Sequence, residues 1–253
     1  MRRSKIEKVA LITGASRGIG AATALLAAQR GYAVCVNFHS NEAAAEKVVA
    51  DIVKIGGKAI AVAADVSSEA DVVRLFKTVD SKLGRLDALV NNAGILDRQT
   101  RLEAMDAGRL NRIFATNITG SFLCAREAVL RMSTRHGGIG GAIVNVSSGA
   151  SRLGSPGEYV DYAASKGAVD TMTIGLAKEV AEERIRVNAV RPGFIYTDMH
   201  ASGGEPDRVD RLKAFVPMKR GGHASEVAQA ILWLLSDESS YTTGAFIDIS
   251  GGR

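Results

Sequence analysis

The sequence predicts an α/β fold: a doubly wound parallel sheet of seven strands with helices on both faces, in one domain that spans residues 1–253. Short apolar runs rich in Val, Ile and Ala alternate with longer stretches of helical periodicity, which is typical of chains that cross from one parallel strand to the next. Only 4 Pro occur, and no linker, internal repeat or low-complexity tract divides the chain. A single Rossmann-type sheet with one core follows from these observations.

The elements are expected in a regular order. The predicted strands cover residues 8–13, 33–38, 59–64, 86–91, 142–147, 185–191 and 245–249. The predicted helices cover residues 18–30, 41–54, 68–83, 102–134, 157–182 and 224–236. Ligands of such sheets bind beyond the carboxyl ends of the strands, so the residues that follow each strand are the first candidates for function.

A glycine-rich turn, Thr13 to Gly20, joins the first strand to the first helix. Gly14, Gly18 and Gly20 have the spacing G-x-x-x-G-x-G and allow the backbone to bend and to approach a pyrophosphate closely. The helix that follows directs its free N–H groups and its dipole at whatever lies over the turn. A plain tight turn is the alternative, but the position between a strand and a helix favours dinucleotide binding.

Tyr162 and Lys166 lie one helical turn apart and on the same face of a predicted helix. Free tyrosine titrates near 10, and lowering its pKa toward 7 needs about 4 kcal/mol of preferential stabilisation of the phenolate, which a neighbouring ammonium could supply. The pair therefore predicts proton-transfer chemistry. Spacing alone does not establish it, because Tyr and Lys at i,i+4 are usually a solvated helix face.

Several stretches in the right order carry a resemblance to the short-chain dehydrogenase/reductase family over nearly the whole chain. They are Thr13–Gly20, Asn91-Asn-Ala-Gly94, Asn117 in Ala115-Thr-Asn117, Ser148 in Val144-Asn-Val-Ser-Ser148, Tyr162 with Lys166, and Pro192-Gly193. The sequence is similar to the branch of 3-oxoacyl-carrier-protein reductases and glucose or other sugar dehydrogenases. It is also similar to uncharacterised bacterial oxidoreductases with a stretch like S-P-G-E-Y-V-D-Y, here Ser155 to Tyr162.

The resemblance implies an oxidoreductase (EC 1.1.1.-) that interconverts a carbonyl and a secondary alcohol by hydride transfer. It implies that Tyr162 is the general acid or base, that Lys166 lowers its pKa and holds the nicotinamide ribose, and that Ser148 binds the carbonyl oxygen. Asn117 would anchor a water that links Lys166 to solvent.

Two neighbours of these residues are the competing candidates. Tyr159 has Ala163, not a cation, four residues later and is expected to line the substrate pocket. Ser147 and Ser148 should face opposite sides of a strand, so that only one of them reaches the cofactor. The family pattern favours Ser148.

The resemblance also implies a set of cofactor contacts. They are Gly14, Ser16, Arg17, Gly18, Ile19, Gly20, Phe38, His39, Ser40, Asp65, Val66, Asn92, Ala93, Gly94, Tyr162, Lys166, Pro192, Gly193, Ile195 and Thr197. Some have structural alternatives. Asp65, or equally Ser67, could cap the next helix; Asn91 and Asn92 could shape a turn; Thr197 could be the neighbour of a helix N-cap.

Charge at the end of the second strand favours NADP(H) over NAD(H). NAD enzymes generally place an acid there to bind the ribose hydroxyls, whereas this chain reads Val36-Asn-Phe-His-Ser40. Arg17 in the glycine turn could bring a guanidinium to the 2′-phosphate. Arg17 could also be an ordinary exposed arginine, and Phe38 could merely pack against the adenine.

Charge and cysteine content exclude other classes. The net charge of +5 comes from 32 basic and 27 acidic residues that are interleaved, so nucleic acid is not expected as a partner. Cys35 and Cys124 lie in apolar segments and are expected to be buried thiols, as in a reducing cytoplasm. The four histidines, at 39, 136, 200 and 223, are separated, so no metal site is expected.

Membrane insertion and secretion are not expected either. The start Met-Arg-Arg-Ser-Lys has no apolar core, and no apolar run approaches the ~18 residues of a membrane span. The expected location is the cytoplasm.

The substrate is left open. The resemblance assigns its choice to the segment 194–222, where Gly203-Gly204 and the charged run Asp207 to Lys213 suggest a polar lid. A 3-oxoacyl-thioester reductase and a sugar dehydrogenase both remain, with a small carbonyl or alcohol as the substrate. A binding protein that senses NADP(H) without turnover is the alternative class.

A homotetramer is expected, because two helices and an edge strand carry more apolar surface than one sheet can cover. The positions are Ile113, Ile118, Phe122, Leu123, Val129, Ala163, Ala168, Met172, Leu176 and the strand Ala245–Ile249. The alternative is that the rest of a large monomer wraps these helices.

Overall fold

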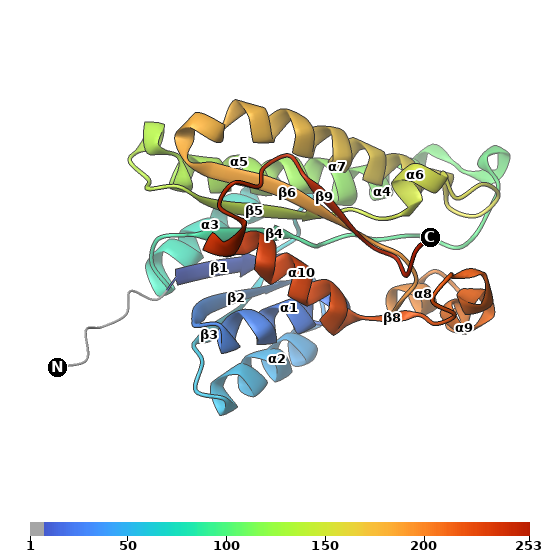
Figure 1. Cartoon of the computed structure of the whole chain (residues 1–253), viewed down its shortest axis with the longest axis horizontal. Coiled ribbons are helices and arrows are strands. Elements are labelled where there is room, and N and C mark those ends of the chain that lie inside the picture. The colour runs from blue at the N-terminus through green and yellow to red at the C-terminus, as the bar shows by residue number, and fades with distance from the viewer. Residues whose placement is uncertain (1–7) are drawn as a thin grey trace.

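The computed structural model describes residues 8–253 and confirms a single doubly wound domain (Figure 1). Its main sheet has seven parallel strands in the order β3-β2-β1-β4-β5-β6-β9. They are β1 Lys8–Ile12, β2 Tyr32–Phe38, β3 Ala59–Ala63, β4 Ala88–Asn91, β5 Gly141–Val146, β6 Ile185–Pro192 and β9 Phe246–Ile249. The expectation about the start of the chain falls on residues 1–7, outside the described residues.

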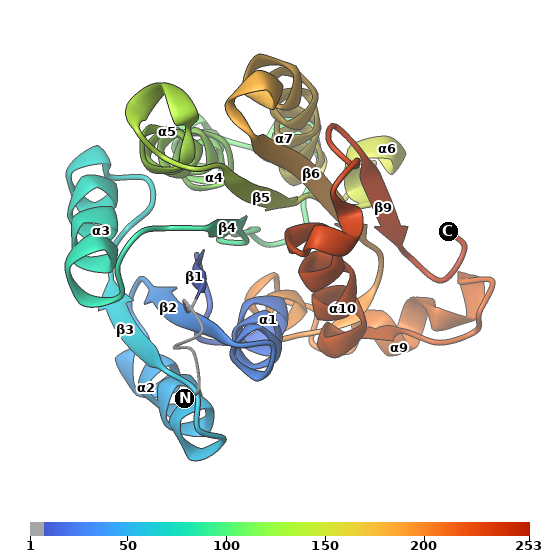
Figure 2. The same ribbon diagram turned by 60° about the vertical axis from the view of Figure 1, so that its left-hand side comes forward.

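Helices cover both faces of the sheet, with α1, α2 and α10 on one side and α3, α4, α5 and α7 on the other (Figure 2). Their bounds are α1 Gly18–Gln29, α2 Glu42–Lys54, α3 Glu69–Lys82, α4 Ala107–Phe114, α5 Gly120–Met132, α6 Ala150–Leu153, α7 Val160–Glu179, α8 Met199–Ser202, α9 Arg208–Leu212 and α10 Ala224–Leu235. Short 3-10 turns cover Leu102–Ala104, Thr134–His136, Ala181–Glu183, Lys213–Phe215 and Asp237–Ser239.

Strand alternation divides the core into two layers. Ala10 and Ile12 of β1 pack under α1 and α10, whereas Val9 and Leu11 pack under the helices of the other face. Side chains of a strand point alternately to opposite faces, so each strand must be apolar at every position to fill both layers. This explains why the sequence shows continuous apolar runs.

The predicted helix 102–134 is wrong as one continuous element. Residues Leu102–Ala104 form a 3-10 turn, α4 begins only at Ala107, and a π-helical turn at Ala115–Thr119 separates α4 from α5. Asp106 starts α4, because its Oδ1 accepts a hydrogen bond from the Arg109 N–H at 2.7 Å.

The predicted start of the helix 157–182 is also wrong by three residues. The helix begins at Val160 and ends at Glu179. Gly157 adopts φ +74°, a left-handed conformation that a helix cannot contain, and Tyr159 at the N-cap has φ −143°.

The segment 194–222 leaves the main domain and returns to it at the same place. Its ends, β7 Ile195–Tyr196 and β8 Gly222–His223, pair in a second, two-stranded parallel sheet. The short helices α8 and α9 lie between them, beyond the carboxyl ends of the main strands (Figure 1). We call residues 194–222 the lid segment.

The surface expected to meet other subunits is only partly exposed. Ile113, Ala163 and Met172 are buried within the chain itself, so they do not call for a partner. Phe122 on α5 is 51% exposed, and Leu130 on α5 and Ile174 on α7 are exposed as well. Strand β9 pairs with β6 alone and is an edge of the sheet, as predicted.

Both cysteines are buried and free, as expected for small apolar side chains. Within residues 8–253, we find no helix long and apolar enough to span a bilayer. The same residues contain no group of three or more His, Cys, Asp or Glu side chains placed to hold a metal ion.

Candidate active site

A cavity of about 1310 Å³ opens at the carboxyl ends of the strands, between the glycine turn and the lid segment. The predicted site residues on its wall are Gly14, Ser16, Arg17, Gly18, Ile19, Phe38, His39, Ser40, Asp65, Val66, Asn92, Ala93, Gly94, Ser148, Tyr162, Lys166, Pro192, Gly193, Ile195 and Thr197. Gly20 and Asn117 are not on the wall and lie behind it. The sheet thus brings together residues that are up to 183 positions apart in the sequence, from Gly14 to Thr197, because parallel strands all end at one edge.

The glycine turn has no room for side chains. Gly14 has φ +60°, and a Cβ atom there would lie 2.9 Å from the Ala93 Cα; a Cβ on Gly20 would lie 2.5 Å from the Gly14 carbonyl oxygen. Arg17 is at the N-cap of α1 and makes no side-chain cap. The first N–H groups of α1 are therefore left for an anion, and this cradle suits the pyrophosphate of a dinucleotide.

Three uncharged side chains hold this turn in place. Asn92 donates through Nδ2 to the carbonyl oxygens of Thr13 and Gly14 at 2.8 and 2.9 Å. The Thr13 hydroxyl accepts from the N–H groups of Asn92 and Ala93, both at 3.0 Å. Asn37 accepts from the Gly14 N–H at 3.2 Å. Asn92 therefore shapes the turn as well as lining the cavity.

Sequence reasoning did not assign a role to Thr13 or Asn37. Both are buried, and Asn37 also donates to the carbonyl oxygens of Val62 and Ala64 at 3.2 and 3.1 Å. The available signal was a polar residue inside the apolar run Tyr32–Phe38, where an unpaired amide would be costly.

The adenosine end differs from the expectation in one respect. Arg17, His39 and Ser40 are exposed on the cavity wall, as an anion site requires. An acid does lie nearby, however, because Asp65 Oδ2 is 3.9 Å from His39 Nε2. Asp65 follows the neighbouring β3 and was expected among the cofactor contacts, but the expectation from charge rested only on the end of β2.

Neither Asp65 nor Ser67 caps the next helix. Ser68 is the N-cap of α3, and Asp65 Oδ1 instead accepts hydrogen bonds from the Ser67 N–H and hydroxyl at 2.9 and 2.8 Å.

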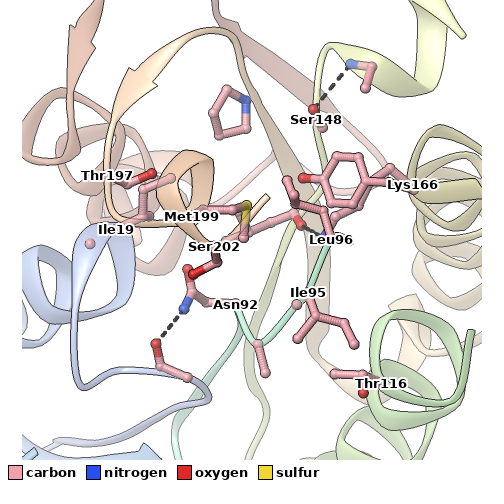
Figure 3. A pocket seen from close by; sticks show the side chains of 18 of the residues that line it. Ile19, Asn92, Ile95, Leu96, Thr116, Ser148, Lys166, Thr197, Met199 and Ser202 are labelled. Carbon is pink, nitrogen blue, oxygen red and sulfur yellow. Dashed lines mark hydrogen bonds between the residues drawn. The ribbon is translucent and has the colours of Figure 1, made fainter. Parts of the chain in front are cut away.

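Ser148, Tyr162 and Lys166 all line the cavity, and Figure 3 labels Ser148 and Lys166. The Lys166 Nζ lies 5.6 Å from the centre of the Tyr162 ring and donates to the Val146 carbonyl oxygen at 2.8 Å. The predicted one-turn geometry of the pair is therefore present on α7. Ser147 also lines the cavity, but its hydroxyl is bonded elsewhere, because it donates to the Lys166 carbonyl oxygen at 3.3 Å.

The pKa of Tyr162 does not follow the expectation from spacing. Burial raises it to about 12, and a side-chain hydrogen bond with Ser148 lowers it less. Burial also lowers the pKa of Lys166 to about 8, against the charge of Asp170, which raises it. Desolvation disfavours both the Tyr162 phenolate and the Lys166 ammonium, and its effect on the two pKa values is larger than the attraction that the spacing suggested.

Asn117 lies in the π-helical turn and ties two elements together. Its Oδ1 accepts from the Ile95 N–H at 2.8 Å, and its Nδ2 donates to the Ile95 carbonyl oxygen and the Ser165 hydroxyl at 2.9 and 3.0 Å. The amide thus links the chain after β4 to α7, close to Lys166.

The cavity is also lined by Leu96, Met199, Ser202, Phe194 and Tyr159, of which Figure 3 labels the first three. Tyr159 does have a cation, contrary to the interpretation from spacing. The Arg208 guanidinium from the lid segment lies 5.0 Å from the centre of its ring. Arg208 is 49 positions away in the sequence, so helical spacing could not indicate it.

A parallel sheet whose glycine turn faces a Ser, a Tyr and a Lys across one cavity is typical of a dinucleotide-dependent oxidoreductase. Residues 14–253 match the family model described as enoyl-(acyl carrier protein) reductase. The chain is an oxidoreductase that belongs to the short-chain dehydrogenase/reductase family. Membership implies a nicotinamide cofactor and a small-molecule substrate.

Similar proteins are bacterial. An uncharacterised oxidoreductase of Escherichia coli strain K12 is 64% identical over 245 residues, which cover 97% of this chain and 99% of that protein. A 3-oxoacyl-[acyl-carrier-protein] reductase of Synechocystis is 42% identical over 97% of this chain and 96% of its own length. The crystal structure of a short-chain type dehydrogenase/reductase from Mycobacterium marinum superposes with a TM-score of 0.91 at 36% identity, covering 97% of this chain and 94% of that one.

Proposed function

We propose that the protein interconverts a carbonyl and a secondary alcohol with NADP(H), as an EC 1.1.1.- dehydrogenase or reductase. The observation that carries the proposal is that Ser148, Tyr162 and Lys166 share the wall of the cavity into which the glycine turn opens. The implied cofactor contacts on the rest of that wall, from Gly14 to Thr197, would hold the dinucleotide. The nicotinamide, when bound, supplies or accepts the hydride.

The chain's own residues handle the proton. In reduction, the Tyr162 phenol gives its proton to the carbonyl oxygen while the Ser148 hydroxyl donates a hydrogen bond to that oxygen. The Lys166 ammonium beside the ring stabilises the phenolate that remains, and Asp170 favours its charged form. In oxidation the proton returns to Tyr162. Asn117 would support the water that exchanges this proton with solvent.

Replacing Tyr162 by Phe tests the proposal. The ring remains and only the transferable proton is lost, so turnover should fall by about 10³-fold or more while the NADPH dissociation constant, from cofactor fluorescence, stays within about threefold. Comparable turnover in the variant would remove Tyr162 from the chemistry.

The preference for NADP(H) rests on Arg17 at the glycine turn and on His39 and Ser40 beside it. If the Arg17 guanidinium pairs with the 2′-phosphate, Arg17→Ala should weaken NADPH binding about tenfold or more and leave NADH binding nearly unchanged, as for a charge-assisted contact of ~1.5–3 kcal/mol. Equal weakening of both coenzymes would contradict this preference.

The alternative is a binding protein that senses NADP(H). A sensor needs the glycine turn but not the combination of Ser148, Tyr162 and Lys166, and their presence in one wall supports the enzyme. A turnover screen with NADPH over acetoacetyl thioesters, sugars and simple ketones separates the two classes. The same screen decides between a 3-oxoacyl thioester and a sugar as the substrate.

We also propose a homotetramer in the cytoplasm, without nucleic-acid or membrane partners. Exposed Phe122, Leu130 and Ile174, together with the open edge of β9, support association. Light scattering coupled to gel filtration should give four times the chain mass of 26.6 kDa; a mass near 26.6 kDa at micromolar concentration contradicts the proposal.

A further inference from the structure

The first turn of α7 lacks a side-chain cap at its N-cap residue. Tyr159 occupies that position and makes no capping hydrogen bond. The free N–H groups of a helix start need partners. Asp161 supplies one, because its Oδ1 accepts a hydrogen bond from the Tyr162 N–H at 2.9 Å. The backbone of Tyr162 is therefore held by the carboxylate next to it.

That carboxylate is bound in turn by an arginine from α4. Arg109 donates to Asp161 through Nε at 2.7 Å and through Nη2 at 3.3 Å. Its Nη1 donates to the Arg98 carbonyl oxygen at 2.6 Å. The side chains of Arg109 and Asp161 are only 9% and 0% exposed. One buried guanidinium thus joins α4, the start of α7 and the chain that follows β4.

The chain that follows β4 also lines the cavity. Leu96 lies two residues before Arg98 and points into the cavity (Figure 3). Two residues after Arg98, the Thr100 N–H donates to the Glu158 carbonyl oxygen at 3.1 Å. This loop is consequently bound to the residues that precede Tyr162 once directly, through Glu158, and once through Arg109, which binds Asp161.

A contribution to stability does not by itself explain why Arg109 and Asp161 form a buried ion pair. Desolvation of two buried charges costs roughly as much as their attraction returns, so a buried ion pair is a weak source of stability. What a two-pronged Arg–carboxylate contact does supply is a fixed geometry. Arg109 and Asp161 are not among the residues that line the cavity, so they do not touch its contents.

We propose that Arg109 and Asp161 are a positioning pair, which fixes the Tyr162 phenol relative to Ser148 and the Leu96 wall. The proposal rests on the proposed role of Tyr162 as the proton donor. Proton transfer requires the two heavy atoms to be within hydrogen-bond reach, and a small displacement of the donor lowers the rate more than it lowers binding. The pair acts through Tyr162 and not on the substrate.

The test compares Arg109→Ala, Arg109→Lys and Asp161→Asn with the matched control Arg131→Ala. Arg131 is likewise paired with carboxylates, here those of Asp80 and Glu127, and its side chain is 16% exposed, but it lies between α3 and α5 away from the cavity. We expect Arg109→Ala and Asp161→Asn to lower kcat at least tenfold, with KM and the NADPH dissociation constant within threefold. Arg109→Lys keeps the positive charge but not the forked guanidinium, so its kcat should lie between those of the other two variants and that of the unmodified protein. Arg131→Ala should lower Tm with kcat within twofold.

Chemical rescue adds a readout that a general loss of stability would not move. Millimolar guanidinium should restore part of the kcat of Arg109→Ala, at least threefold, whereas equimolar urea should not. Unchanged kcat in Asp161→Asn and Arg109→Lys overturns the proposal, even if Arg109→Ala does not fold. An equal loss of kcat in Arg131→Ala at equal loss of Tm overturns it as well.

Tyr162→Phe is measured in parallel to separate the two proposals. Full activity in Tyr162→Phe would remove the proposed catalytic role and the positioning role with it. An inactive Tyr162→Phe beside fully active Arg109 and Asp161 variants would remove the positioning role alone.

Discussion

The two ends of the cavity are held by different kinds of contact. At the cofactor end, the glycine turn is fixed by backbone groups and by the uncharged side chains of Thr13, Asn37 and Asn92. At the lid end, Arg208 binds Glu158 and Glu205, and its guanidinium stacks over Tyr159 and Phe194. The contacts that hold the glycine turn are uncharged, whereas those that hold the lid end are largely ionic.

The difference teaches which end can adapt. Buried uncharged hydrogen bonds do not respond to pH or salt, and they keep the turn in the one shape that a pyrophosphate needs. Arg208 is only 8% exposed, but Glu158 and Glu205 are 32% and 22% exposed, so these ion pairs are partly open to solvent and to screening by salt. We therefore expect the cofactor end to keep one shape, and the lid end, which we propose closes over the substrate, to be the end that adapts.

The same difference decides what the sequence could predict. The glycine turn, Asn91-Asn92 and the Tyr162–Lys166 spacing are local patterns, and the parallel sheet with helices on both faces follows from the alternation of elements. The partner of Glu158 could not be predicted, because Arg208 is 50 positions away and only the folded lid segment brings them together. The pairing of Arg109 with Asp161, 52 positions apart, escaped prediction for the same reason.

Two errors have local physical causes. Helical periodicity extends through residues 102–134, but it does not register that Asp106 caps a new helix or that the backbone widens into a π turn at Asn117. The pKa of Tyr162 was predicted from its distance to one cation, whereas burial, which sequence spacing does not contain, has the larger effect.

A matched pair of glycine substitutions gives the largest expected contrast between the ends. Gly14 and Gly204 both have positive φ, +60° and +85°. A Cβ on Gly14 would meet the Ala93 Cα at 2.9 Å, but a Cβ on Gly204 has no neighbour nearer than 3.8 Å. Gly14→Ala should weaken NADPH binding about 100-fold, or ~2.7 kcal/mol, by displacing the turn. Gly204→Ala should cost about 1 kcal/mol of stability and leave NADPH binding unchanged. Fluorescence titration and thermal unfolding measure both, and similar cofactor affinities in the two variants would erase the contrast.

Removing the lid arginine should affect the other end alone. Arg208→Met keeps most of the side-chain volume and loses the ion pairs with Glu158 and Glu205. We expect KM for the substrate to rise about tenfold, with the NADPH dissociation constant within about threefold. Arg220→Met is the control, since Arg220 forms an exposed ion pair with Glu226 outside the cavity, and exposed pairs contribute ~0–1 kcal/mol. A larger loss of cofactor affinity than of substrate affinity would show that the ends are not separable.

Lowering the pH should weaken the packing of the lid segment, with a smaller effect on KM than the Arg208→Met substitution has. His200 lies on the cavity wall, and its Nε2 is 3.1 Å from the Ile195 carbonyl oxygen. Burial, followed by the charge of Arg208, lowers the pKa of His200 below its ordinary value of 6.5, while Glu205 acts in the opposite direction. The packed lid segment therefore favours the neutral ring. This contribution is complete above about pH 6.5 and is lost as the pH falls from there through the lowered pKa. KM for the substrate, measured between pH 8 and pH 5, should rise about two- to fivefold on the acid side, and His200→Gln should flatten that rise. As a reference for the cofactor end, the NADPH dissociation constant of Arg17→Ala is measured as well. This variant lacks the charged group proposed to meet the 2′-phosphate. An acid-dependent rise in KM that persists in His200→Gln would assign the effect to another group.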